Sequence, residues 1–357
     1  MKKDLFNKKI LYTDVKLGKI PFNRGFTIKK FLNFVLIYSQ MKIFKNSRVY
    51  GKPYRLIIDP VNICNLKCSL CPTGANSPGR KKCSMKFEEF KKIIDEMGDY
   101  LYSIDLYNWG EPFLNKDIFK MIRYARRKNI IVHISSNLNI FDEKNAEKLV
   151  DSRLDYLVVS LDGGSQETYE QYRIGGNFDQ VIKNIKLVVQ KKKEKKSKFP
   201  VICWQLLVMK QNEGELEKVK KMAKEIGVDI LDFKPIRADL GHEVLKSDKE
   251  KYDSAKEFLP EDEKLSRFDY NKKKRSNKVT NCLYLWSSMT INPDGGVSPC
   301  CSTYEDVFDF GNILTDGFKK VWNNENYVES RKLIAKGKEP KVKTVCYSCY
   351  KNGIVDN

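Results

Sequence analysis

Three cysteines whose spacing suits metal chemistry stand in the first quarter of the chain: Cys64, Cys68 and Cys71. They follow the apolar run 55–61, which predicts a short buried strand with the thiols on the loop at its carboxyl end. In α/β barrels this end of the strands carries the chemistry. Three thiolates on one loop can hold three corners of a cubic iron-sulfur cluster, whose usual complement is four cysteines. The fourth iron would then be open to another ligand.

Zinc is the main rival metal for this group of cysteines. Zinc knuckles and ribbons usually pair two short Cys/His elements within a few dozen residues. Here the nearest further cysteine is Cys83, which follows a Lys/Arg stretch. The spacing therefore favours an iron-sulfur cluster over structural zinc.

A second group of cysteines lies near the carboxyl terminus. Cys282 precedes a strand predicted over 286–292, and the Asp-Gly pair at 294–295 supplies the positive φ angles of a tight hairpin turn. The returning strand ends in Cys300 and Cys301, and a C-x2-C pair follows. Four thiolates could thus meet: Cys282, Cys300 with Cys301 as the alternative, Cys346 and Cys349. Zinc and an iron-sulfur cluster both accept four thiolates.

Length and composition limit the class of protein. A chain of 357 residues can form about two domains with a sizeable core. Nothing at the amino terminus resembles a signal peptide, and no apolar run approaches the roughly 20 residues that span a bilayer. We therefore expect a cytoplasmic protein. In that compartment, ten cysteines indicate metal or redox chemistry rather than disulfides.

Positive charge is concentrated in three segments. The net charge is +20, and residues 1–53 alone hold thirteen Lys and Arg against Asp4 and Asp14. The segments 186–198 and 272–278 are also strongly basic. Such a field would attract an acidic electron donor such as flavodoxin or ferredoxin, an anionic membrane, or, as the least favoured partner, a nucleic acid. Lysines that simply decorate solvated loops explain the charge equally well.

Short apolar strands alternate with amphipathic helices after Pro53. Strands are predicted over 55–61, 103–108, 131–137, 156–162, 201–209 and 228–235. Helices are predicted over 87–97, 116–127, 143–150, 178–190 and 216–226, with the lysines of 191–196 in a solvated connection. This alternation implies right-handed crossovers and a parallel sheet. The predicted fold is α/β, a partial TIM barrel of six β/α units.

The segment 26–45 has the pattern of a helix. Lys29, Lys30 and Lys42 flank the apolar stretch 31–38, which is too short to span a membrane. The helix could lie in the interface of an anionic membrane, which would make the protein membrane-peripheral. The arrangement that we favour is a helix packed over the outside of the barrel.

Polar motifs follow the predicted strands. Asn-Trp-Gly-Glu-Pro at 108–112 follows the second, Ser-Ser-Asn at 135–137 ends the third, Ser160 lies at the end of the fourth, and Arg173 lies downstream. A tight turn and a carboxylate can accept hydrogen bonds from an amine, hydroxyls and amides suit a ribose, and a guanidinium pairs with a carboxylate. Each motif alone could be a turn or a helix cap. Their order at successive strand ends indicates one site.

The C-x3-C-x2-C spacing and these motifs together resemble the radical S-adenosylmethionine (SAM) enzymes, although Trp109 replaces the first glycine of the family's G-G-E-P element. The resemblance implies a 4Fe-4S cluster on Cys64, Cys68 and Cys71 whose open iron is chelated by SAM. It also implies that an electron from the cluster splits SAM to a 5′-deoxyadenosyl radical, which takes hydrogen from a substrate. The SAM-binding residues that it implies are Gly110, Glu111, Ser135, Ser136, Asn137, Ser160 and Arg173.

The carboxyl-terminal cysteines resemble the SPASM/Twitch extension of a subset of these enzymes. The extension's G-x4-C element fits Gly295 to Cys300, which implies a second, auxiliary 4Fe-4S cluster on Cys282, Cys300, Cys346 and Cys349. A full SPASM domain has further cysteines, so the one-cluster, Twitch-like form is the better match. Beside a radical SAM core, iron-sulfur is favoured over zinc at this site.

The resemblance also implies a domain plan and an activity. The expected parts are a basic extension with an amphipathic helix (1–53), a radical SAM core (54–240), a linker (241–281) and an auxiliary cluster domain (282–357). The implied enzyme is an oxidoreductase acting on a sugar, a lipid-linked glycan or another small polar substrate. Peptide maturation and RNA modification are alternative activities, and a metal-binding adaptor is the non-enzymatic alternative. No residue identifies itself as the catalytic base.

Overall fold

The computed structural model describes residues 25–236, 256–266, 268–269, 274–275, 279–280, 282–351 and 355–356. Most of the predicted linker at 241–281 and the first 24 residues of the predicted extension lie outside these ranges. The domain limits at residues 53, 240 and 281 therefore stay predictions.

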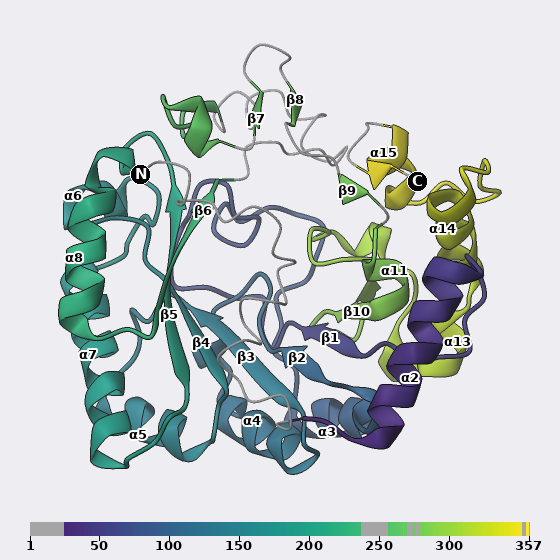
Figure 1. Cartoon of the computed structure of the whole chain (residues 1–357), viewed down its shortest axis with the longest axis horizontal. Helices are drawn as coiled ribbons and strands as arrows, with labels where there is room; N and C mark the ends of the chain where they lie inside the picture. Colours follow the sequence, from purple (N-terminus) through teal and green to yellow (C-terminus); the bar gives the residue numbers. More distant parts are fainter. Residues whose placement is uncertain are drawn as a thin grey trace.

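A curved sheet of six parallel strands in sequence order forms the core. The strands are β1 (Arg55–Ile58), β2 (Ser103–Asp105), β3 (Ile131–Ser136), β4 (Tyr156–Ser160), β5 (Val201–Val208) and β6 (Ile230–Pro235). Figure 1 shows this sheet as an incomplete barrel with helices on its outer face. The predicted partial barrel is confirmed. Each strand is slightly shorter than the apolar run that predicted it, because residues at the ends of these runs belong to the loops and do not pair with a neighbouring strand.

Five amphipathic helices cover the outer face of the sheet. They are α3 (Phe87–Met97), α4 (Ile118–Arg127), α5 (Glu143–Asp151), α7 (Phe178–Glu194) and α8 (Leu216–Ile226), with the short α6 (Gln166–Glu170) before α7. Side chains cap two of these helices: Asp142 accepts a hydrogen bond at the start of α5, and Asn177 does so at the start of α7. Helices α4 and α8 have no side-chain cap. The predicted starts agree to within two residues because each helix begins where its apolar periodicity begins.

Helix α7 is longer than predicted. The lysines of 191–196 are predicted to lie in a solvated connection, but the first three belong to the last turn of α7. Lys191 Nζ lies 2.8 Å from a Glu143 carboxylate oxygen, and Lys192 Nζ lies 2.7 Å from an Asp229 carboxylate oxygen. These ion pairs, together with the preference of cations for the carboxyl end of a helix, explain the extension.

The carboxyl-terminal hairpin extends the barrel sheet. Strand β10 (Ser288–Ile291) pairs in parallel with β1, so that Met289 lies opposite Leu56. Strand β11 (Val297–Ser298) then pairs antiparallel with β10. Gly295 in the turn has a φ of +83°, as predicted, but Asp294 does not have a positive φ, so only the glycine of the pair adopts the left-handed conformation. The sheet of the barrel thus continues into the region that carries the second cysteine group.

The first strand of this hairpin is shorter than the predicted 286–292. Tyr284–Ser287 forms a helical turn, α11, before β10 begins. The Ser287 hydroxyl donates at 2.8 Å to the carbonyl of Leu283, the residue that precedes this turn. Apolar patterning could not separate the turn from the strand, because both are buried.

Four further helices follow the hairpin, and residues within 322–331 contact the segment that precedes β1. The helices are α12 (Ile313–Asp316), α13 (Phe318–Trp322), α14 (Glu325–Lys336) and α15 (Val345–Lys351). Trp322 Nε1 donates to the Gly51 carbonyl at 2.9 Å, and Asn323 exchanges hydrogen bonds with the backbone of Val49. These contacts join the two ends of the described chain.

The amino-terminal helix α2 (Ile28–Tyr38) lies on the outer side of the molecule and continues as a π-helical turn, η2 (Ser39–Ile43) (Figure 1). Lys30, Asn33 and Ile37 are its buried residues. The helix therefore packs over the outside of the fold, but it does so through a largely polar face. Within the described ranges, no helix is long and apolar enough to cross a membrane.

The inner face of the barrel carries polar groups. Alternation along β3 places His133 and Ser135 on the face opposite to the helices. On this inner face the His133 ring packs against the buried ring of Tyr156. His133 Nδ1 lies 2.8 Å from Asp105 Oδ1, and the other carboxylate oxygen of Asp105 pairs with Arg55. Three neighbouring strands thus contribute one side chain each to a polar cluster inside the barrel, which contains the Arg55–Asp105 ion pair.

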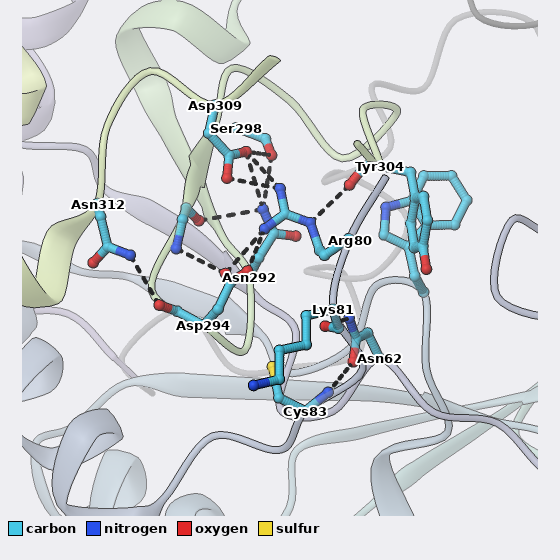
Figure 2. Close-up of polar contacts among 12 residues, drawn as sticks. Asn62, Arg80, Lys81, Cys83, Asn292, Asp294, Ser298, Tyr304, Asp309 and Asn312 are labelled. Atoms are coloured by element: carbon cyan, nitrogen blue, oxygen red, sulfur yellow. Dashed lines mark hydrogen bonds and ion pairs between the residues drawn. The ribbon is translucent and has the colours of Figure 1, made fainter. Parts of the chain in front are cut away.

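One arginine fixes the hairpin to the loop that follows β1. The Arg80 side chain is 1% exposed, and it donates to the carboxylates of Asp294 and Asp309 at 2.7–2.9 Å (Figure 2). Arg80 Nε also donates to the Tyr304 carbonyl at 2.7 Å. Asp309 accepts a further hydrogen bond from the Ser298 hydroxyl on β11 at 2.8 Å. The network holds together two regions more than 200 residues apart in the chain.

Replacing Arg80 by Met should lower the free energy of unfolding by about 3 kcal/mol, because two half-buried carboxylates lose their shared cation. Burial raises the pKa of Asp309 and Arg80 lowers it, so the variant's Asp309 pKa rises further. An acid with a raised folded-state pKa destabilises the fold above that pKa, so the deficit should shrink as the pH falls.

Denaturant titrations of the Arg80→Met variant at about pH 8 and about pH 6 measure both effects. The control is Arg127→Met at an exposed position on α4, which should change stability by less than about 0.5 kcal/mol. A deficit for Arg80→Met no larger than that of the control would contradict the anchoring role.

Candidate metal centres and SAM site

The loop between β1 and α3 carries the first cysteine group at the carboxyl edge of the sheet. Burial, with smaller contributions from Glu111 and the neighbouring thiols, raises the pKa of Cys64 to about 12. Burial also raises the pKa of Cys68 and Cys71. Metal ligation selects the thiolate, so grouped thiols that stay neutral by themselves release protons when a cluster binds. The donor set fits a cluster held by three thiolates.

A second loop lies directly against the cysteine loop at Gly110. A Cβ atom at this position would lie 1.7 Å from the Val61 carbonyl oxygen, so only glycine allows the approach. The next residue, Glu111, donates its backbone N–H to the Ile63 carbonyl at 2.9 Å. The Gly-Glu-Pro element therefore joins the cysteine loop through backbone contacts.

The Glu111 carboxylate is buried and holds the end of β3. It accepts hydrogen bonds from the Ser136 hydroxyl at 2.7 Å and from the Asn137 N–H at 2.8 Å. It also accepts from the Phe113 N–H at 3.2 Å. Burial raises the pKa of Glu111, while these donors oppose the rise. A carboxylate has about four acceptor positions, so one stays available for an amine.

Asn137 connects the end of β3 to the cysteine loop. Its Nδ2 lies 3.0 Å from Asn65 Oδ1 and 3.7 Å from Cys64 Sγ. Its Oδ1 accepts from the Asn139 N–H at 2.9 Å. These contacts fix the amide beside the first cysteine.

Ser135 and Ser160 form a hydroxyl pair inside the barrel. Their Oγ atoms lie 3.2 Å apart across the neighbouring strands β3 and β4. Hydroxyl groups both donate and accept, so the pair can bind a ribose or a carboxylate.

Arg173 is buried between an aspartate and a cysteine. Its Nε donates to Asp162 Oδ2 at 2.6 Å, and its Nη1 lies 3.8 Å from Cys68 Sγ. Burial alone would lower the pKa of Arg173, but Asp162 and Cys68 raise it well above its ordinary value. Asp162 also accepts from the Leu207 N–H at 2.6 Å, which fixes the acid. The guanidinium is therefore held beside the cysteine loop.

Five of the seven predicted SAM residues form one neighbourhood with the cysteine loop, and the other two, Ser135 and Ser160, pair with each other inside the barrel. Gly110, Glu111, Asn137 and Arg173 contact this loop directly, Ser136 binds Glu111, and Ser135 pairs with Ser160. Their assignment as SAM contacts stays a prediction.

Sequence reasoning missed Asp59, which directly follows β1. Its buried Oδ2 accepts from the Trp109 N–H at 3.1 Å, and burial raises the pKa of Asp59 to about 7. The sequence did contain a signal for this residue: Asp59 is an acidic residue between an apolar run and Pro60. Asp59 shapes the turn that presents Gly110.

Trp109 contacts both cysteine regions. Its carbonyl oxygen lies 3.9 Å from Cys71 Sγ, and its Nε1 donates to the Thr303 carbonyl at 3.2 Å. The Thr303 Oγ1 lies 3.8 Å from Cys300 Sγ. The residue that replaces the family's glycine therefore connects ligands of both predicted clusters.

The second cysteine group surrounds a cavity with apolar walls. The cavity is lined by Cys282, Cys300, Cys346 and Cys349 together with Leu285, Pro299, Ile334, Val345 and Val355. Cys346 and Cys349 are one turn apart on α15, so both can face the same side. Burial raises the pKa of Cys282 to about 12. Four thiols around a cavity with otherwise apolar walls fit an iron-sulfur cluster.

Cys301 points elsewhere. Its Sγ lies 3.6 Å from the Tyr284 hydroxyl, and Cys301 is absent from the cavity lining. The geometry therefore favours Cys300 over Cys301 as the fourth ligand.

Replacing Glu111 by Gln should weaken SAM binding by about 10- to 100-fold, because a charged acceptor of three protein hydrogen bonds is lost. Cluster iron content should stay unchanged. Equilibrium SAM binding to anaerobically reconstituted protein measures the effect. Glu329→Gln, which alters a buried carboxylate on α14, is the matched control. Equal SAM affinity in Glu111→Gln and the control would contradict the role of Glu111.

Two families match the chain. The radical SAM superfamily matches residues 58–223, and the SPASM iron-sulfur cluster-binding domain matches residues 282–350. The first match covers the three-cysteine loop and every predicted SAM residue. The second covers all four cysteines that line the carboxyl-terminal cavity.

Individual relatives agree with this match. The AdoMet-dependent heme synthase of Methanosarcina barkeri is 26% identical over 314 residues, which cover 80% of this chain and 88% of the relative. A probable GTP 3′,8-cyclase of Methanococcus maripaludis is 25% identical, over 75% of this chain and 92% of the relative. The solved structure of anSMEcpe with bound AdoMet and the Cp18Cys peptide superposes with a TM-score of 0.54 at 18% identity, over 84% of this chain and 96% of that chain.

The fold, the cysteine loop and the four-cysteine cavity agree with these matches. The cofactors are SAM, the 4Fe-4S cluster that binds it and an auxiliary iron-sulfur cluster. The chain therefore belongs to the radical SAM superfamily and is a radical SAM enzyme with a carboxyl-terminal SPASM domain.

Proposed function

We propose that this enzyme removes hydrogen from a small polar substrate, such as a sugar or a lipid-linked glycan, and oxidises it with the auxiliary 4Fe-4S cluster as electron acceptor. The observation that carries the proposal is the row of contacts from Cys71 through Trp109 and Thr303 to Cys300. It supports two clusters that serve one substrate, because their ligands belong to one packed network.

The residues of the chain prepare the site for this chemistry. When bound, the SAM cluster supplies the electron that cleaves SAM to the hydrogen-abstracting radical. Gly110 lets the second loop approach the cysteines, and Glu111 offers a buried negative charge for the SAM amine. Arg173 offers a positive charge for the SAM carboxylate, and the Ser135–Ser160 pair offers hydroxyls. Oriented groups of this kind need little reorganisation when the cofactor binds.

The inner face of the barrel supports a polar substrate. Arg55, Asp105 and His133 form a charged group there, and the serine pair lies on the same face. An apolar substrate would bury against these groups without hydrogen bonds, which is unfavourable. The names of the relatives refer to chemically different molecules, so they do not indicate the substrate class of this enzyme.

An acidic electron donor of the flavodoxin or ferredoxin type fits the charge of this chain. The net charge of +20 would attract such a protein at long range and raise its association rate. A cytoplasmic location belongs to the same proposal, because that compartment keeps the ten cysteines reduced.

Deuterium transfer identifies the substrate class. Reconstituted enzyme is incubated with SAM, reductant and per-deuterated nucleotide sugar, lipid-linked glycan, peptide or tRNA, and 5′-deoxyadenosine is analysed by mass spectrometry. We expect deuterium from a sugar or glycan together with a product two hydrogens lighter. Transfer only from peptide or tRNA, or a product of unchanged oxidation state, would contradict the proposal.

Cys300 and Cys301 provide a matched pair of variants. Cys300→Ala should lose the auxiliary cluster and fall from about eight irons per chain to about four, while Cys301→Ala keeps both clusters. SAM cleavage without substrate turnover is expected for Cys300→Ala. Iron and sulfide analysis measures the cluster content, and equal losses in the two variants would contradict the assignment of Cys300.

A further inference from the structure

Helix α2 packs with its faces reversed. A surface helix normally turns its apolar stripe toward the core. In α2 the buried positions include Lys30 and Asn33, whereas Ile28 and Leu32 are 73% and 61% exposed. At 100° per residue, the exposed apolar residues occupy one continuous face: Ile28, Phe31, Leu32, Val35 and Leu36.

Polar contacts hold this reversed orientation. Lys30 Nζ donates to the Asn129 carbonyl at 2.6 Å. Asn33 exchanges hydrogen bonds with the backbone of Lys52 at 2.8 and 2.9 Å. The buried face is therefore specifically satisfied, and the helix cannot turn its apolar face inward without breaking these bonds.

The exposed apolar face continues beyond the helix. Ile43 and Phe44 at the end of η2 are 68% and 63% exposed, and Tyr38 and Tyr50 are exposed as well. Figure 1 shows α2 on the outer side of the molecule, away from the strands. We define the membrane face as the exposed apolar residues of 28–44. Many exposed apolar side chains on one segment of this kind indicate an interaction site.

The charge around the membrane face indicates which kind of partner binds there. No acidic residue occurs between Asp14 and Asp59, and Lys42, Lys45 and Arg48 are exposed beside the apolar residues. A second copy of the chain would bring the same basic segment against itself, which is repulsive. Exposed apolar side chains with flanking lysines instead fit an interface of acyl chains and anionic headgroups.

We propose that the membrane face docks this enzyme on the surface of an anionic bilayer. The apolar side chains of α2 and η2 enter the boundary between headgroups and acyl chains, while the flanking cations contact lipid phosphates. The helix lies in the plane of the membrane, and the cluster-bearing barrel stays outside the bilayer.

Vesicle co-sedimentation of the reconstituted full-length enzyme tests the proposal. Vesicles of phosphatidylglycerol with phosphatidylcholine are compared with vesicles of phosphatidylcholine alone. We expect binding to the anionic vesicles that weakens with salt. Leu32→Glu should reduce this binding by about tenfold or more, because it places a charge in the apolar boundary. Val307→Glu, at an apolar residue of similar exposure in a distant 3-10 turn, should bind as the unmodified enzyme does.

A second pair of variants tests the charge. Lys42→Glu should weaken binding to anionic vesicles about tenfold, whereas Lys224→Glu on α8 should leave it unchanged. All four variants should cleave SAM at the same rate, which shows that they fold. Absence of binding to anionic vesicles, or equal binding by Leu32→Glu and Val307→Glu, would overturn the proposal. A dimer that Leu32→Glu converts to a monomer would overturn it too, because a second copy would then occupy the face.

Discussion

The parallel pairing of β10 with β1 determines where both cysteine groups lie. Without β10, strand β1 would be an edge of the barrel sheet with unpaired backbone groups. With β10 in register, the hairpin turn meets the loop that follows β1, and Arg80 binds the two acids that the hairpin region presents. The four-cysteine cavity is consequently built onto the barrel sheet, and Trp109 can contact both regions.

Burial of charge explains the rigidity of the site. Glu111 and Asp59 are buried and the Arg173 side chain is mostly buried, and an ion without partners is strongly unfavourable in such surroundings. Each is held by N–H or carboxylate groups from a different strand end. The groups predicted to bind SAM are therefore fixed before the cofactor arrives, and the cluster thiols release their protons when metal enters.

The sequence was sufficient for the fold and for most of the site. Strands, helices and cysteine loops follow from local signals, namely apolar periodicity, capping residues and cysteine spacing. The missed features depend on contacts between distant segments. The sequence around Arg80 does not indicate that it pairs with Asp294 and Asp309. The apolar pattern of α2 likewise does not show that the polar face of this helix is buried. The lysines that end α7 are helical because of ion pairs that no local pattern contains.

The claim on which this account depends is that the chain holds two iron-sulfur clusters, one of which cleaves SAM. Anaerobic reconstitution, iron, sulfide and zinc analysis, and chromatography for 5′-deoxyadenosine after reduction with SAM test it together. The account predicts about eight irons per chain, no zinc, and formation of 5′-deoxyadenosine. About four irons with one zinc would contradict the auxiliary cluster, and absence of SAM cleavage under every reductant would contradict the enzymatic assignment.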